Sequence, residues 1–180
     1  MRIERNDVMA VVVDYQEKLI PVIHDNETIV KNSGILINGL RELEVPFIVS
    51  QQYTKGLGET IEPINNALGD VKYFEKKTFS LWQNEEIKEA IMVSGKKTAI
   101  ICGVEAHICV LQTVIDLRDV GYNVVLVTDC IGSRKKIDKK FACKRAAEEG
   151  AFLTTYEAIL YELTVGADSP YFKTISKLTK

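Results

Sequence analysis

Several common features are missing from this chain of 180 residues, and each absence narrows what it does. No stretch approaches the roughly 18 consecutive apolar residues that a membrane-spanning helix needs. Residues 1–16 become acidic before any long apolar segment develops, which is not the pattern of a secretory signal. The four cysteines form no CxxC pair, so without a secretion signal a disulfide framework is not expected. We therefore expect a cytoplasmic protein without a membrane partner.

An excess of charge of one sign is also missing. The formal net charge is −2, and acidic and basic residues are mixed along the chain, so no nucleic-acid partner is indicated. We interpret the densest basic run, residues 134–140, as a solvated helix face. The length and the ordinary apolar content are typical of one globular domain with a sizeable core, and we expect it to span residues 1–180.

Motifs for cofactors and metals are scarce as well. The turn after the first predicted strand, residues 14–18, contains no glycine, although a dinucleotide site needs glycines there for close approach of the phosphates. The GxG at residues 56–58 continues to no third glycine, and there is no Walker motif. The only histidines, His24 and His107, show no metal-binding spacing. We expect neither a cofactor nor a metal.

What the sequence does contain is an alternation of apolar runs with amphipathic segments. This alternation predicts an α/β fold of three αβα layers, Rossmann-like and doubly wound, around a mainly parallel six-stranded sheet in the order 3-2-1-4-5-6. A capping box of Thr154 and Glu157 is expected to open the helix at 156–163, and Ser169-Pro170 to open a last helix. The strands are expected at 8–13, 46–50, 71–76, 98–102, 123–128 and 151–154, and other helices at 28–43, 84–93, 108–120 and before Gly150.

This topology brings two polar segments together. Strands 1 and 4 lie side by side at the switch point of such a sheet, where ligands bind beyond the carboxyl ends. Asp14 ends the first strand, and residues 103–109 follow the fourth. Gln16 shares a side with Asp14 if the strand continues, because side chains repeat every two residues. A lone aspartate here is usually a cap or turn former, but a thiol opposite Asp14 favours a functional role.

The candidate thiol is Cys109. It lies in the first turn of its predicted helix, where unpaired N–H groups and the helix dipole lower a thiol pKa. The alternative is a buried structural cysteine, which is the role we assign to Cys102, Cys130 and Cys143. His107 stands two residues before Cys109, and such neighbours do not face one another on a helix. A base for the thiol must therefore lie elsewhere.

A candidate cation lies in the segment FEKKTFS, residues 74–80, which places two lysines in an aromatic setting at the end of the third strand. A lysine in such a place is usually a surface residue whose alkyl chain lies along apolar neighbours. It can instead be desolvated and paired with a carboxylate, stabilising both an aspartate and a thiolate. The residues alone leave both roles open.

Five segments together resemble the isochorismatase-like hydrolase superfamily, the cysteine hydrolases that include nicotinamidases. They are VVVDYQEKL, QQYTKGLGET, EKKTFS, CGVEAHICV and GAFLTTYEAIL, they span nearly the whole chain, and they look most like the small isochorismatase-domain-containing proteins. The resemblance implies a Rossmann-like fold with an Asp-Lys-Cys triad, matched by Asp14, Lys76 and Cys109. The family's lysine stands four residues before a serine that follows an aromatic residue; here Ser80 selects Lys76 over Lys77.

The resemblance also implies a cis peptide bond between Val104 and Glu105. That bond would aim the backbone N–H groups of Glu105 and Cys109 at a developing oxyanion. The implied activity is hydrolysis of a small amide-type molecule through a thioester on Cys109, with Asp14 carrying the proton. Relatives that cleave the vinyl ether of isochorismate need no cysteine there. Assembly as a homo-oligomer is implied as well. Candidate pocket residues are Gln16, Phe79, Trp82 and His107.

Two departures from the family pattern concern the substrate. Metal-binding nicotinamidases carry an Asp-x-His segment where this chain has residues 50–53, SQQY, so a metal-held pyridine is not expected. Glu105 is larger and more acidic than the small residue that nicotinamidases use at that position. Two alternatives to an amide hydrolase also exist: a non-catalytic interaction protein that keeps the scaffold, and a thiol redox sensor, for which Cys102 is a poor resolving partner of Cys109.

Overall fold

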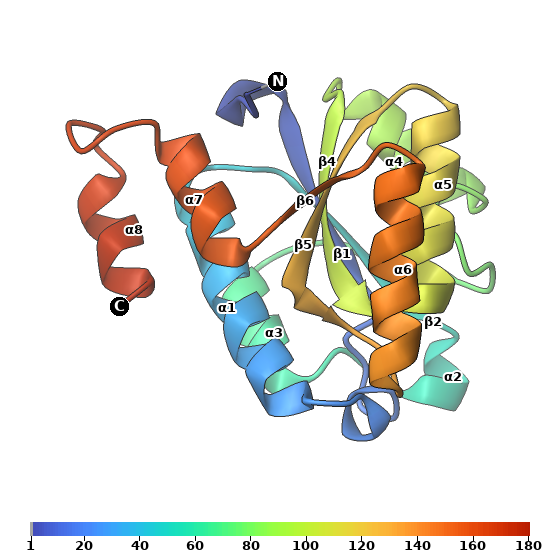
Figure 1. The fold of residues 1–180 in the computed structure, drawn as a ribbon. Coiled ribbons are helices and arrows are strands. Elements are labelled where there is room, and N and C mark those ends of the chain that lie inside the picture. Colours follow the sequence, from blue (N-terminus) through green and yellow to red (C-terminus); the bar gives the residue numbers. More distant parts are fainter. Residues whose placement is uncertain (1) are drawn as a thin grey trace.

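The computed structural model describes residues 2–180 and contains a six-stranded parallel sheet at its centre (Figure 1). The strand order is β3-β2-β1-β4-β5-β6, and every neighbouring pair is parallel, which confirms the predicted fold class and order. The strands are β1 (Val8–Val13), β2 (Phe47–Gln52), β3 (Tyr73–Lys76), β4 (Thr98–Val104), β5 (Asn123–Gly132) and β6 (Phe152–Thr154).

Helices cover both faces of the sheet. Figure 1 shows one layer formed by α1 (Asn26–Glu42), α3 (Glu62–Leu68), α7 (Tyr156–Thr164) and α8 (Phe172–Leu178). The other layer contains α4 (Glu85–Val93), α5 (Leu111–Asp119) and α6 (Lys136–Glu148). Alternate residues of β1 belong to the two separate cores, so the whole strand is buried and its sequence is continuously apolar. The remaining short helices are η1 (Arg5–Asp7), η2 (Ile20–Val22), α2 (Thr54–Leu57) and the π-helix η3 (Ala106–Val110).

Element boundaries agree with the pattern where a clear capping residue exists. The Asn84 side chain accepts a hydrogen bond from the N–H of Ile87 at 3.1 Å and so begins α4, as predicted. The predicted capping box at Thr154 is wrong by one residue, because Thr155 accepts the hydrogen bond from the N–H of Ala158. The last helix begins at Phe172, after a turn at 169–171. Helices α2 and α3 were not predicted.

The central strands β1 and β4 approach each other closely where they end. Val13 pairs with Gly103, and a Cβ atom at Gly103 would lie 2.5 Å from the carbonyl oxygen of Val13. Gly103 also has φ +154°, which L side chains rarely adopt. Glycine is therefore required where the two strands place Asp14 beside the turn that carries Cys109.

Candidate active site

The first polar group at the carboxyl ends of the central strands is the carboxylate of Asp14, whose side chain is fully buried. The chain leaves β1 at Asp14 with φ 57°, an uncommon left-handed conformation for a residue other than glycine. One carboxylate oxygen, Oδ1, accepts a hydrogen bond from Ser50 Oγ at 2.7 Å. The other, Oδ2, accepts one from Lys76 Nζ at 2.7 Å. Both oxygens are thus held in one orientation by donors from β2 and β3.

Lys76 is a buried ion-pair partner and not a surface lysine, whereas Lys77 is exposed. Besides Asp14, its ammonium donates to Gln52 Oε1 at 2.7 Å and to the carbonyl of Thr78 at 3.3 Å. Three acceptors therefore satisfy the three N–H groups. This matters because a buried ammonium without partners costs several kcal/mol.

Cys109 lies in η3 with 5% of its surface exposed, and its thiol is influenced by both charges of the pair. Burial raises the pKa of the thiol to about 12; the Asp14 carboxylate adds to the increase and the Lys76 ammonium opposes it. The prediction of a lowered thiol pKa is therefore wrong, because desolvation by burial is the largest influence on this thiol. The resting thiol is protonated and adjacent to a carboxylate.

The turn before Cys109 differs from the predicted one. No cis peptide bond occurs among residues 2–180, so the prediction of one between Val104 and Glu105 is wrong. The chain turns instead by placing Glu105 in the left-handed region, with φ 53° and ψ 55°. One π-helical turn follows before α5 begins, a distortion that is frequent at functional sites. Thr113 Oγ1 donates to the carbonyl of Cys109 at 2.7 Å and anchors this turn.

Gln16 does not continue strand β1, and its side-chain amide is hydrogen-bonded to backbone groups. Its amide nitrogen donates to the carbonyls of Gln52 and Gly58, at 2.9 and 2.7 Å, and its oxygen accepts from the N–H of Gln52 at 2.7 Å. Gln16 therefore positions Gln52, which in turn binds Lys76. Sequence reasoning missed Gln52, although its spacing two residues after Ser50 at the end of β2 was an available signal.

The other candidate pocket residues, Trp82, Phe79 and His107, have different surroundings. Trp82 packs edge-on against Tyr122, with ring centroids 5.8 Å apart. The residue before Trp82, Leu81, donates its N–H to Thr113 Oγ1 at 3.1 Å, and the same Oγ1 donates to the carbonyl of Cys109. Phe79 is 53% exposed. The Nδ1 atom of His107 lies 3.0 Å from Ser133 Oγ, so His107 contacts the loop that leads into α6.

The remaining thiols are consistent with structural roles. Burial raises the pKa of Cys102 to about 12 and raises that of Cys130 still further. Cys143 is half-buried, and burial raises its pKa as well. All four cysteines are free thiols, and no disulfide bond joins any two of them.

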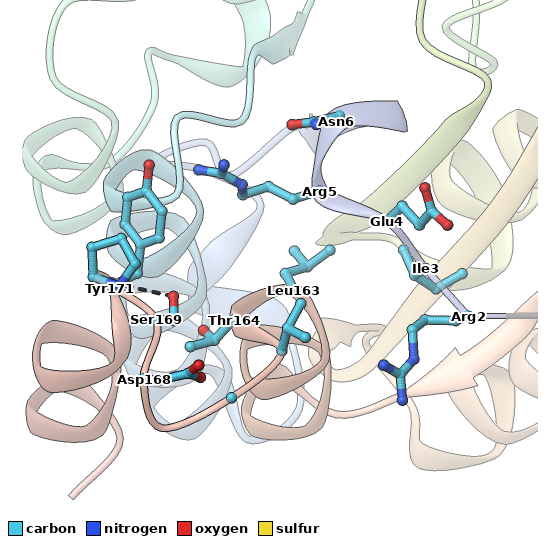
Figure 2. Close-up of a pocket in the computed structure, with 13 residues that line it drawn as sticks. Arg2, Ile3, Glu4, Arg5, Asn6, Leu163, Thr164, Asp168, Ser169 and Tyr171 are labelled. Carbon is cyan, nitrogen blue, oxygen red and sulfur yellow. Dashed lines mark hydrogen bonds between the residues drawn. The ribbon is translucent and has the colours of Figure 1, made fainter.

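Within residues 2–180, no group of three or more histidine, cysteine or acidic side chains is arranged to hold a metal ion. None of the helices in the same range has the length and apolar character to cross a membrane. A pocket of about 700 Å³ lies between the residues before β1 and the segment that follows α7. Figure 2 shows residues that line it, among them Arg5 and Tyr171. The pocket lies at the amino end of β1 and is therefore separate from the Asp14 site.

The parallel sheet between two helix layers, with Asp14, Lys76 and Cys109 at its switch point, defines a three-layer α/β protein with a polar site at the carboxyl ends of its central strands. The family description "Isochorismatase domain" matches residues 8–158, which is most of the chain. The chain belongs to the isochorismatase family, as the sequence resemblance predicted.

Individual relatives agree with this assignment. Isochorismatase domain-containing protein 2 of Xenopus laevis is 34% identical over 97% of this chain and 84% of its own length. The solved structure of MAR1 ribonuclease from Caenorhabditis elegans is 37% identical with a TM-score of 0.93, covering 99% of this chain and 92% of that one. The Escherichia coli YcaC structure, described as an octameric hydrolase of unknown specificity, is 25% identical with a TM-score of 0.92, covering 99% and 90%. The family is thus generally one of hydrolases.

Proposed function

We propose that the chain is a cysteine hydrolase that cleaves a small amide-type molecule through a thioester on Cys109, with residues 1–180 as one catalytic domain. The observation that carries this proposal is the burial of a complete ion pair, Asp14 and Lys76, against a buried thiol. Burying two charges costs free energy that hydrophobic residues would not cost, so a chemical role for the pair is a direct explanation.

The first step transfers the thiol proton to Asp14. With a pKa of about 12, Cys109 carries almost no thiolate at neutral pH, so a neighbouring base must accept the proton as the sulfur attacks. Asp14 is that base, because its carboxylate acts directly on the thiol. The Lys76 ammonium stays charged and stabilises the negative charge that passes from carboxylate to sulfur.

The second step forms the thioester. Cys109 sulfur attacks the carbonyl carbon, and the oxyanion is received by the backbone N–H groups of Glu105 and Cys109. Because the bond before Glu105 is trans, the placement of its N–H depends on the left-handed turn at that residue. The C–N bond then breaks, and the protonated Asp14 returns its proton to the departing amine or ammonia.

The last step consumes water. Asp14, again a carboxylate, deprotonates a water molecule that attacks the thioester, and the products are a carboxylic acid and the free Cys109 thiol. No electrons are exchanged and no cofactor is needed in this sequence. Of the predicted pocket residues, Trp82, Phe79 and His107 remain in the proposal, whereas the Gln16 side chain is hydrogen-bonded to backbone groups.

The decisive experiment is an activity screen on purified protein, in which intact-mass spectrometry looks for an acyl adduct on Cys109. A panel of small amides and imides is expected to yield one substrate whose hydrolysis is lost in Cys109→Ala and kept in Cys143→Ala, a matched change of the half-buried thiol on α6. Absence of turnover and of any adduct across the panel would contradict the proposal. RNA belongs in the panel because the nematode neighbour is called a ribonuclease, and Cys109-dependent RNA cleavage would also contradict it.

A non-catalytic interaction protein is the second candidate, and the low exposure of Cys109, 5%, is the observation that favours it. The two candidates differ in thiol behaviour. A working nucleophile forms an acyl adduct with a substrate of the amide panel and loses it in Asp14→Asn, because the proton acceptor is gone, whereas an inert buried thiol forms no adduct in either protein.

The partners follow from the same proposal. We expect a small-molecule substrate, a cytoplasmic location and no nucleic acid, despite the basic residues that begin α6. We also propose a homo-oligomer, in line with the octameric description of YcaC. Ile137 and Phe141, which are 50% and 60% exposed on α6, provide apolar surface for such contacts.

A further inference from the structure

Glu105 is a buried acid at the same edge as Cys109, and the proposed reaction uses only its backbone. The residue is 7% exposed and directly follows β4. One side-chain oxygen, Oε1, lies 2.8 Å from Nε of Arg134. The other, Oε2, is buried without any hydrogen-bond partner among residues 2–180. A buried carboxylate oxygen without a donor costs free energy, and such an atom in a native fold requires an explanation.

The neighbouring side chains do not supply the missing donor. His107 Nδ1 is 3.7 Å from Oε2, beyond hydrogen-bond distance, and lies 3.0 Å from Ser133 Oγ instead. Arg134 forms its ion pair through Nε with Oε1, and its side chain is 53% exposed at the surface. The fold therefore holds Glu105 in place by one oxygen and leaves the other without a hydrogen-bond donor.

The backbone of Glu105 belongs to the turn that carries the reacting thiol. Its left-handed backbone starts the π-helical turn that contains Cys109, and its carbonyl accepts the N–H of Ile108 at 2.8 Å. Any molecule whose carbonyl reaches Cys109 must approach the edge of the sheet at this turn. A buried acceptor there discriminates between molecules by the donors and charge they carry.

We propose that the Glu105 carboxylate recognises the substrate, and that the substrate is an amide carrying a cationic or N–H-donating group, such as an ammonium or guanidinium, beside the scissile bond. This inference rests on the proposed function, because it takes Cys109 as the nucleophile. A bound donor satisfies Oε2, and its positive charge compensates the buried negative charge. Anionic amides are disfavoured, because they place a like charge next to Glu105.

The test measures the charge preference of Cys109 itself, with three alkyl methanethiosulfonates as probes: 2-aminoethyl, 2-hydroxyethyl and 2-sulfonatoethyl. In each case the Cys109 sulfur forms a disulfide with the alkylthio group and methanesulfinate departs. Rates are followed by intact mass in a Cys143→Ser background and divided by the rate of each probe with 2-mercaptoethanol. We expect the cationic probe to react about tenfold faster than the anionic one, and Glu105→Gln to reduce that ratio to about one.

The chain offers a matched control at the other end of α6. Glu149 Oε1 lies 3.4 Å from Nε of Arg145, so Glu149→Gln removes a comparable arginine partner far from the thiol and leaves the ratio unchanged. Arg134→Gln, in contrast, removes the opposing positive charge and increases the cationic preference. A preference for the anionic probe that disappears in Arg134→Gln would overturn the inference, because Arg134 would then be the recognition group.

The wild-type ratio keeps the inference falsifiable even if Glu105→Gln does not fold, because equal rates for the three probes at Cys109 overturn it. The readouts also separate the two proposals. Loss of the acyl adduct from the whole amide panel contradicts the hydrolase, whereas an unchanged probe ratio in folded Glu105→Gln contradicts the role of Glu105. Among matched amides, the hydrolysed ones are expected to be those bearing an ammonium or guanidinium.

Discussion

Replacing Asp14 by asparagine tests the energetics of the buried pair. The side chains of Asp14 and Lys76 are fully buried, and their charged atoms are 2.7 Å apart. The variant leaves the Lys76 ammonium desolvated, with only the oxygens of Gln52 and Thr78 as its other acceptors. Removing one partner of a buried ion pair typically costs about 3–5 kcal/mol. We expect a decrease of this size in the free energy of unfolding, measured by urea denaturation.

The surface of the same protein supplies a matched control. Lys72 Nζ lies 2.8 Å from Glu86 Oε1, almost the same separation, but both side chains are more than 60% exposed. Solvent-exposed pairs contribute about 0–1 kcal/mol, so Glu86→Gln is expected to change stability by less than about 1 kcal/mol. Equal losses in Asp14→Asn and Glu86→Gln would refute the argument that burial makes the first pair strong.

The same variant has an opposite effect on the thiol. The Asp14 carboxylate raises the pKa of Cys109, whereas Lys76 lowers it, so removing Asp14 lowers that pKa. Each unit of pKa changes the thiolate fraction about tenfold at pH 8. We therefore expect Asp14→Asn to be alkylated faster by iodoacetamide while it loses all hydrolysis, since the proton acceptor is gone. Slower or unchanged alkylation in the folded variant would show that Asp14 does not act on the thiol.

The remaining predictions concern the pH dependence of stability, the packing around two glycines and the hydrogen bond from Lys76 to Gln52. The pKa of Cys109 is about 12 in the folded protein and about 8.5 for an ordinary thiol, so the contribution of this thiol to stability is complete below about pH 8.5 and is lost as the pH rises toward 12. The free energy of unfolding should therefore decline less steeply between about pH 8 and pH 11 in Cys109→Ala than in the wild type. Parallel pH curves of the two proteins would contradict this. Gly103→Ala should cost about 2–3 kcal/mol because its Cβ has no room, whereas Gly34→Ala, with open space around its Cβ, should stabilise by about 0.5–1 kcal/mol in thermal denaturation. Gln52→Ala deprives Lys76 of one acceptor and should cost about 1.5–3 kcal/mol, and a change near zero in urea unfolding would show that water replaces it.

Much of the fold was predictable because the strands are continuous apolar runs. β1 was predicted with its exact bounds, and the alternation of patterns predicted a parallel sheet whose expected strand order is confirmed. Helices α2 and α3 were missed because segments of four and seven residues carry too few periodic positions to stand out.

The sequence by itself determined which groups are present and that Asp14 and Cys109 follow neighbouring strands. It also indicated Lys76 through the resemblance to a family, although the lysine is 62 residues from its aspartate. Only the tertiary structure decided their chemical state: the full burial of the ion pair, the raised pKa of Cys109, the trans turn at Glu105 and the unpaired Oε2 atom. The reason is that desolvation depends on which distant segments exclude water from a group, and local patterns carry no information about that.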